Sequence, residues 1–312
     1  MLLVHKGREG ENPVFIQPGF AEHPSTFEAF SRALHEKGPN VLANAHANKE
    51  SKARLSERLE AAKKRAHGLY QEKIAAGVVD PTELQTLLDR ITLTIFAEAE
   101  AFISLVEDGS IDRSGSVRAV LHSQGSLIGL AAATLRPDLF SGSTLVLVNP
   151  SGFTGKRETA AEGRAPSASS HIARNRKDSF WKTFNRGDRL QFQYVFALIS
   201  ALAAHGTKML STTADNLRYI GAHTLNLGIF KEAQDMANTD ALPFAQFLHR
   251  TIGADIYVVA DTSDKVFPYR AIKERLQDIT DIALHTTTGE GHFGPVHNPK
   301  KLAEVIGAIV GR

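Results

Sequence analysis

Short apolar runs alternate along the chain with longer stretches in which apolar residues recur every three or four positions. The runs occupy residues 14–17, 41–43, 116–121, 143–149, 255–260 and 282–285. Helical patterns span 27–34, 81–106, 124–135, a segment from Pro268 and 302–310. Because each parallel crossover needs a covering helix, the alternation predicts an α/β fold with a mostly parallel sheet and helices on both faces.

Two segments interrupt this alternation. Residues 48–80 are strongly charged and carry only scattered leucines, which predicts an exposed, partly helical insertion. Between residues 151 and 250 the strand signal disappears and helical patterns take over. We therefore expect one α/β core, built from residues 1–150 and 251–312, that carries a helical cap or lid at 151–250.

Composition narrows the class of protein. The 36 basic and 34 acidic residues leave a formal charge of +2, so no global charge favours nucleic acid as a partner. The chain has no cysteine, which excludes disulfides and thiolate chemistry. The opening residues MLLVHK are too polar for a secretory signal, so we expect a cytoplasmic protein. We expect no membrane span, because the longest apolar stretch, 192–204, is shorter than the roughly 20 residues required.

A strand-to-helix junction carries the first candidate for chemistry. The apolar run 116–121 ends in a turn of sequence HSQG, from His122 to Gly125, and a helical pattern follows at once. A serine at such a junction, here Ser123, lies at the N-terminus of a helix, where backbone N–H groups and the helix dipole favour a developing oxyanion. The alternative is that Ser123 only caps the helix, since serine is a preferred N-cap residue.

Two later loops follow predicted strands, and the carboxyl ends of parallel strands are where ligands bind in such sheets. The sequence DTSDKVFP, from Asp261 to Pro268, follows the run 255–260. The sequence GEGHF, which contains His292, follows the last strand. An ordinary Asp-rich turn would explain the first loop taken alone, and His297 is an alternative to His292.

Together these segments resemble the α/β-hydrolase superfamily. The HSQG turn is similar to its nucleophile elbow, G-x-S-x-G, with Leu121 in place of the first glycine. The loop after residue 260 resembles the family's acid loop, Gly-x-x-Asp-x-x-x-Pro, with Asp264 as the acid and Asp261 at the glycine position as the fallback. The GEGHF segment resembles the family's terminal Gly-x-Gly-His loop. The residues also follow the family's chain order of Ser, Asp and His.

The resemblance implies a role for each residue. Ser123 is the nucleophile, His292 the general base and Asp264 the acid that orients the histidine. The oxyanion hole is expected from the backbone N–H groups of Gln124 and of Phe20. Phe20 lies in the segment QPGFA, which is similar to the family's His-Gly-x stretch with Pro18 in place of histidine.

The function that this resemblance implies is hydrolysis of a carboxylic ester through an acyl-enzyme, acting on a small-molecule substrate without a cofactor. Hydrolysis of thioesters, lactones or carbon–carbon bonds, acyl transfer, and perhydrolysis would use the same triad. A different class of function is a non-catalytic ligand-binding protein with this fold. Leu121 and Pro18, which depart from the family's motifs, keep that alternative open.

Other segments carry weaker signals. Aromatic residues of the expected cap, such as Phe180 and Trp181, could line a pocket, although residues at helical spacing more often pack inside a cap. The basic stretch 156–177 is a candidate mobile lid or anion site, and a solvated connection explains it better. We expect no metal site, because His46 and Glu50 are only one pair where a site needs three or four ligands.

Overall fold

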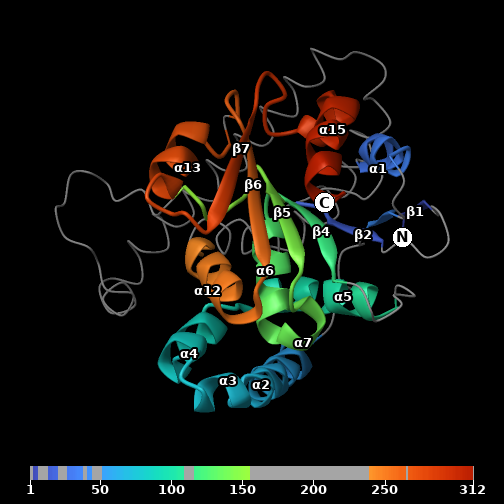
Figure 1. Ribbon diagram of the computed structural model, residues 1–312. Coiled ribbons are helices and arrows are strands. Elements are labelled where there is room, and N and C mark those ends of the chain that lie inside the picture. The colour runs from blue at the N-terminus through green and yellow to red at the C-terminus, as the bar shows by residue number, and fades with distance from the viewer. Residues whose placement is uncertain are drawn as a thin grey trace, which may run out of the picture.

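The computed structural model describes residues 3–5, 13–19, 27–37, 41–43, 51–108, 116–154, 239–264 and 266–311. They include one sheet in the strand order β1-β3-β2-β4-β5-β6-β7 (Figure 1). The strands are β1 (Leu3–His5), β2 (Val14–Gln17), β3 (Val41–Ala43), β4 (Arg118–His122), β5 (Thr144–Val148), β6 (Asp255–Asp261) and β7 (Ile282–Thr287). All neighbours pair in parallel except β1 and β3, which are antiparallel. The expected α/β class is confirmed, and the edge strand β1 is one that the apolar pattern did not indicate.

Helices cover both faces of this sheet. They are α1 (Glu28–His35), α2 (Lys52–Leu69), α3 (Gln71–Ala75), α4 (Pro81–Asp89), α5 (Leu93–Asp108), α6 (Gly125–Leu135), α7 (Pro137–Phe140), α12 (Leu242–Ile252), α13 (Tyr269–Leu276), α14 (Gly294–His297) and α15 (Pro299–Val310). In β5, Leu145 and Leu147 pack in one apolar cluster with residues of α5, α6 and α12. Val146 and Val148 pack in a second cluster with α1 and α15. A strand buried on both faces is apolar throughout, which explains the uninterrupted run at this position.

The helical pattern that begins at Pro81 forms two helices instead of the single one we expected. Helix α4 ends at Asp89 and α5 begins at Leu93. Between them Thr92 accepts a hydrogen bond at its Oγ1 from the Ile95 amide, at 3.3 Å. A threonine hydroxyl that accepts from an amide of the first turn favours the start of a new helix. The apolar residues keep their helical spacing across this point, so the sequence pattern does not show where one helix ends and the next begins.

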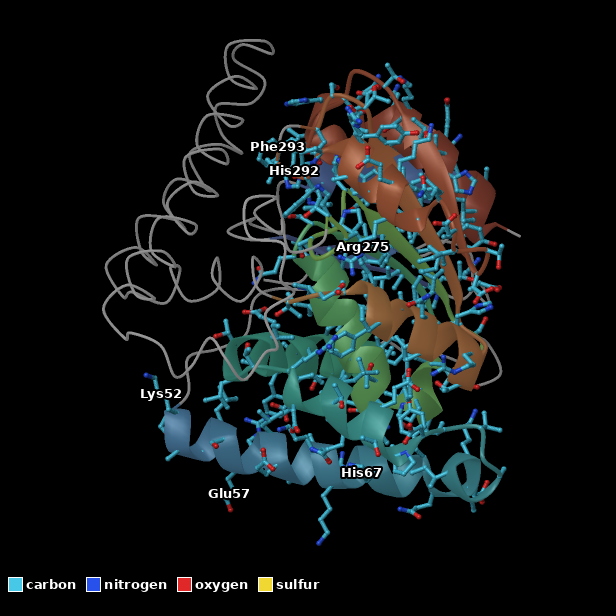
Figure 2. All side chains as sticks on the ribbon, turned by 90° about the vertical axis from the view of Figure 1, so that its left-hand side faces the viewer. Lys52, Glu57, His67, Arg275, His292 and Phe293 are labelled. Atoms are coloured by element: carbon cyan, nitrogen blue, oxygen red, sulfur yellow. The ribbon has the colours of Figure 1, made fainter. Side chains whose placement is uncertain are left out.

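The charged segment after residue 50 contains α2 and α3. Of α2, only Leu59 and Ala66 are buried, which leaves most of its charged side chains exposed. Figures 1 and 2 place α2 at the end of the molecule where the strands begin, opposite the end that carries His292. The helical character expected for this segment is therefore present, on the side of the molecule away from His292.

Most of the expected cap, 151–250, lies outside the described residues, and the division into core and cap stays a prediction. The described part near its end, α12, packs against α6 in the larger apolar cluster. In the described part of the chain, no helix has both the length and the apolar character needed to cross a membrane.

Candidate active site

Ser123 occupies a sharp turn between β4 and α6. Its φ of 54° is in the left-handed region, which a non-glycine residue adopts at a cost of about 1–3 kcal/mol. Neighbouring groups hold this conformation: the Ser123 amide donates to the Val148 carbonyl at 2.9 Å. The Ser123 carbonyl accepts from the Ser126 amide and the Ser151 amide, each at 3.1 Å. These three hydrogen bonds therefore fix the backbone of the residue that joins β4 to α6.

Gly125 allows the loop after β2 to approach this turn. A Cβ atom at Gly125 would lie 2.4 Å from the carbonyl oxygen of Gln17 and 2.7 Å from that of Pro18. Neither distance is possible for a real side chain, so the approach requires glycine. Phe20, the expected second oxyanion donor on this loop, lies outside the described residues, and its role stays a prediction. Gln124 is the N-cap residue of α6, where amides have no partner within the helix.

The structure brings Ser123, His292 and Asp264 together. Ser123 Oγ lies 3.1 Å from His292 Nε2, and His292 Nδ1 lies 2.9 Å from Asp264 Oδ2. The three residues are only 3–6% exposed. Since a carboxylate only accepts hydrogen bonds, Nδ1 carries the hydrogen that donates to Asp264, and in the neutral form of the imidazole Nε2 then accepts from the Ser123 hydroxyl.

Backbone groups fix the orientation of Asp264. Its Oδ1 accepts from the Val266 amide at 2.7 Å and from the Phe267 amide at 3.0 Å. With Oδ1 held by its own loop, Oδ2 is the oxygen that faces His292. Of the two candidate aspartates, Asp264 is therefore the one that contacts the histidine ring, as the loop motif predicted.

Asp261, the fallback acid, binds the histidine loop instead of the histidine ring. Its two oxygens accept hydrogen bonds from the amide and hydroxyl of Ser263, the hydroxyl of Thr287 and the amides of Glu290 and Gly291. Burial alone would raise the pKa of this carboxyl, but the hydrogen bonds from Ser263, Thr287 and Gly291 outweigh burial and lower the pKa below its ordinary value. Asp261 is therefore a buried carboxylate held in its ionised form.

Asn149, which sequence reasoning missed, joins three loops of the site. Its side-chain amide donates to the carbonyls of Gly291 at 3.0 Å and His292 at 3.2 Å, and its Oδ1 accepts from the Asp261 amide at 2.9 Å. Asn149 has a φ of 44°, a conformation that asparagine tolerates better than most residues. The sequence did offer one sign of this role, because Asn149 is a polar residue at the carboxyl end of a buried strand. The candidate loops meet at that edge of the sheet.

Three rings surround the His292 imidazole. The ring centroids of His122, Phe267 and Phe293 lie 5.1, 5.3 and 5.3 Å from that of His292. His122 also donates from Nε2 to the His292 carbonyl at 2.8 Å. The ring contacts pack the imidazole on several sides, and the hydrogen bond from His122 holds the backbone of His292.

The remaining candidates lie elsewhere. The Nδ1 atom of His297 is 2.8 Å from the Glu290 carbonyl, so His297 supports the histidine loop and does not replace His292. Among the described residues, no cluster of three or more His, Asp or Glu side chains is arranged to hold a metal ion. His46 and Glu50, the weak pair noted in the sequence, lie outside the described residues.

Comparison with known proteins finds similarity in fold alone. No family model matches the chain, and no curated protein matches its sequence. An esterase from Exiguobacterium antarcticum matches with a TM-score of 0.60 and 15% identity, over 100% of this chain and 96% of that chain. A thermophilic esterase from Thermogutta terrifontis matches with a TM-score of 0.59 and 13% identity, over 99% and 93%. An alpha/beta hydrolase enzyme from a Medee basin deep-sea metagenome library matches with a TM-score of 0.52 and 12% identity, over 100% and 94%.

Proposed function

Because the chain has the α/β-hydrolase fold, we propose that it is a serine hydrolase that cleaves a carboxylic ester through an acyl-enzyme. The observation that carries the proposal is the continuous chain of hydrogen bonds from Ser123 through His292 to Asp264. A helix cap needs no histidine and no buried aspartate behind it, so the chain of contacts favours an activated nucleophile.

The first half of the reaction transfers the acyl group to Ser123. As Ser123 Oγ attacks the ester carbonyl carbon, His292 Nε2 takes the hydroxyl proton. Asp264 keeps the hydrogen on Nδ1 and stabilises the imidazolium that forms. The imidazolium then gives its proton to the departing alkoxide, which leaves as an alcohol while the acyl group remains on Oγ.

The negative charge that develops on the carbonyl oxygen needs donors nearby. We assign this role to the backbone amide of Gln124, at the N-cap of α6, and retain Phe20 as the expected second donor. Because both donors are backbone groups, the replacement of the family's histidine by Pro18 does not remove them. The helix dipole of α6 adds a favourable field at the same place.

The second half returns the enzyme to its starting state. A water molecule attacks the acyl carbon, and His292 accepts the proton of that water. Ser123 Oγ then leaves, takes the proton from His292, and the carboxylic acid is released. The same groups therefore act in both halves, and every proton passes through His292 Nε2.

The test is covalent labelling followed by intact-mass spectrometry. We expect a fluorophosphonate to add one adduct per chain to the wild-type protein, and Ser123→Ala to abolish it. Ser143→Ala is the matched control, because Ser143 is also buried but lies immediately before β5. A short-chain p-nitrophenyl ester assay on the same three proteins measures turnover, which should follow the adduct.

The outcomes separate the candidate functions. An adduct on Ser123 with ester turnover supports the proposal, and a panel of thioesters and lactones then compares the alternative substrates. No adduct on folded wild-type protein would overturn the proposal and leave the ligand-binding alternative. An adduct that persists in Ser123→Ala would show that the reactive group is another residue.

A further inference from the structure

We infer that Asp261 and Asn149 act together as a clamp that positions His292 against Ser123, an inference that rests on the proposed function. We call this pair the Asp261–Asn149 clamp. Neither residue contacts the imidazole of His292 in the hydrogen bonds described above. Both are therefore positioning residues rather than catalytic residues.

The histidine loop needs external support because of its glycines. Gly289 has a φ of 83° and Gly291 a φ of 64°, which glycine adopts readily because it has no side chain. The same lack of a side chain leaves the backbone of the loop less restricted. Glycine also has the largest conformational freedom to lose on folding. A loop built in this way holds a fixed position only if groups outside it bind its backbone.

The clamp binds the backbone of three consecutive residues in this loop. Asp261 accepts from the amides of Glu290 and Gly291, at 3.1 and 3.0 Å. Asn149 donates to the carbonyls of Gly291 and His292. The two side chains thus hold the loop through both its donors and its acceptors, immediately before the imidazole.

The clamp is also connected to the strand that precedes Ser123. The backbone N–H of Asn149 donates to the Val259 carbonyl at 2.8 Å, and the backbone N–H of Ser123 donates to the Val148 carbonyl at 2.9 Å. The Asn149 side chain accepts from the Asp261 amide at 2.9 Å. The ends of β4, β5 and β6 are therefore joined to one another and to the histidine loop by consecutive hydrogen bonds.

Geometry at the reacting atoms explains why this matters. A displacement of about 1 Å at a catalytic group lowers the rate by about 100-fold. In Asp261→Asn, an NH2 group replaces one of the two carboxylate oxygens. This group cannot accept hydrogen bonds, and it repels the N–H and O–H groups that donate to that oxygen in the wild-type protein. In Asn149→Ala, the carbonyls of Gly291 and His292 both lose the hydrogen bond from Asn149, although His122 still donates to the His292 carbonyl. Each change should therefore displace His292 while all three triad residues keep their side chains.

The test compares rate per folded molecule. We expect Asp261→Asn and Asn149→Ala to lower both kcat and the second-order rate of fluorophosphonate labelling by about 10- to 100-fold. KM should stay within about twofold, because the clamp does not face the substrate in this scheme. The double variant should lose less than the product of the two single losses, because both residues act on one loop.

Milder variants and a matched control keep the test decisive if the main variants fold poorly. Ser263→Ala and Thr287→Val each remove one hydroxyl that donates to Asp261, and we expect smaller losses of the same rates. Asp138→Asn is the control: Asp138 is also a carboxylate with a lowered pKa, because hydrogen bonds and charge from Arg136 outweigh its burial. It belongs to α7, which lies at the end of the molecule where β5 begins (Figure 1), and the variant should label at the wild-type rate.

The result that would overturn the clamp is distinct from failure of the proposed function. If wild-type protein labels at Ser123 while the clamp variants, once folded, label at the same rate and to one adduct per chain, the two residues serve folding alone. If wild-type protein does not label, the proposed function fails first. A thermal-unfolding scan of every variant gives the folded fraction needed for this comparison.

Discussion

The side chain of Leu121 fills the space that a side chain at Gly129 would need. A Cβ atom at Gly129 would lie 2.4 Å from Cδ1 of Leu121 and 2.6 Å from its Cδ2. Leu121 occupies the position where the G-x-S-x-G pattern has glycine, and it is fully buried. The fold therefore accommodates Leu121 because α6 has a glycine where it packs against this side chain.

We predict that these two positions are energetically coupled. Leu121→Ala should lower the free energy of unfolding by about 2–5 kcal/mol through the cavity that it creates. Gly129→Ala should also lower the free energy of unfolding, because the added methyl group meets Leu121. We expect a loss of about 1–3 kcal/mol, part of which the higher helix propensity of alanine offsets. In the double variant the new methyl group enters the vacated space, so its loss should be smaller than the sum. Urea unfolding of the four proteins measures this, and a strictly additive result would contradict the contact.

Gly125→Ala should damage the elbow directly. Its Cβ would meet the backbone oxygens of Gln17 and Pro18, which cannot rotate away as a side chain can. We expect a loss of about 1–3 kcal/mol in stability, together with slower fluorophosphonate labelling, because the loop expected to carry the second oxyanion donor must shift. Gly68→Ala is a suitable control, since nothing lies within 4 Å of a Cβ at Gly68. Wild-type labelling in folded Gly125→Ala would show that the close approach is dispensable.

Asp264→Asn should lower kcat by about 10⁴-fold, the loss known for the equivalent change in a serine protease. The asparagine can still accept from the Val266 and Phe267 amides through its carbonyl oxygen, so the loop should keep its shape. Its amide then faces His292 Nδ1 and selects the wrong tautomer. Steady-state assays of folded protein measure the effect. A loss below about tenfold would argue against Asp264 as the orienting acid.

The lowered pKa of Asp261 predicts how stability depends on pH. The unfolded chain binds a proton at this carboxyl near pH 3.9, whereas the native state binds it only at lower pH. Its contribution to stability is fully present above the unfolded pKa and is lost as pH falls through the native pKa. The gap in unfolding free energy between wild type and Asp261→Asn should therefore be largest near neutral pH and narrow on acidification. Denaturant titrations from pH 7 to pH 3 measure this gap, and a gap that widens in acid would contradict an ionised Asp261.

Most of the sheet could be predicted from the sequence because its central strands are buried on both faces. Strands β2 and β3 have the residues expected, and the ends of β4 to β7 differ by a few residues. The strand β1 was missed because LVH is a short edge segment that pairs with only one neighbour. The break between α4 and α5 was missed because it depends on one hydroxyl, which an apolar stripe does not register.

The residues of the candidate site could be predicted where a local sequence motif marks a loop. They could not be predicted where contacts between distant segments determine a residue's role. Asp261 and Asp264 are three residues apart, and only the distance to His292 separates their roles. Asn149 contacts residues more than 100 positions away, so no local pattern marks it. The accommodation of Leu121 likewise depends on how α6 crosses β4. The cytoplasmic location and the role of Phe20 stay predictions.

The placement of α2 far from Ser123 offers a way to observe this protein without disturbing it. Lys52, Glu57 and His67 of α2 lie at the opposite end of the molecule from His292 and Phe293 (Figure 2). The chain has no cysteine, so a single thiol introduced at the exposed Ala61 of α2 would be unique. A fluorophore or surface tether attached there would lie at the opposite end of the molecule from His292, and would allow single molecules to be followed during turnover.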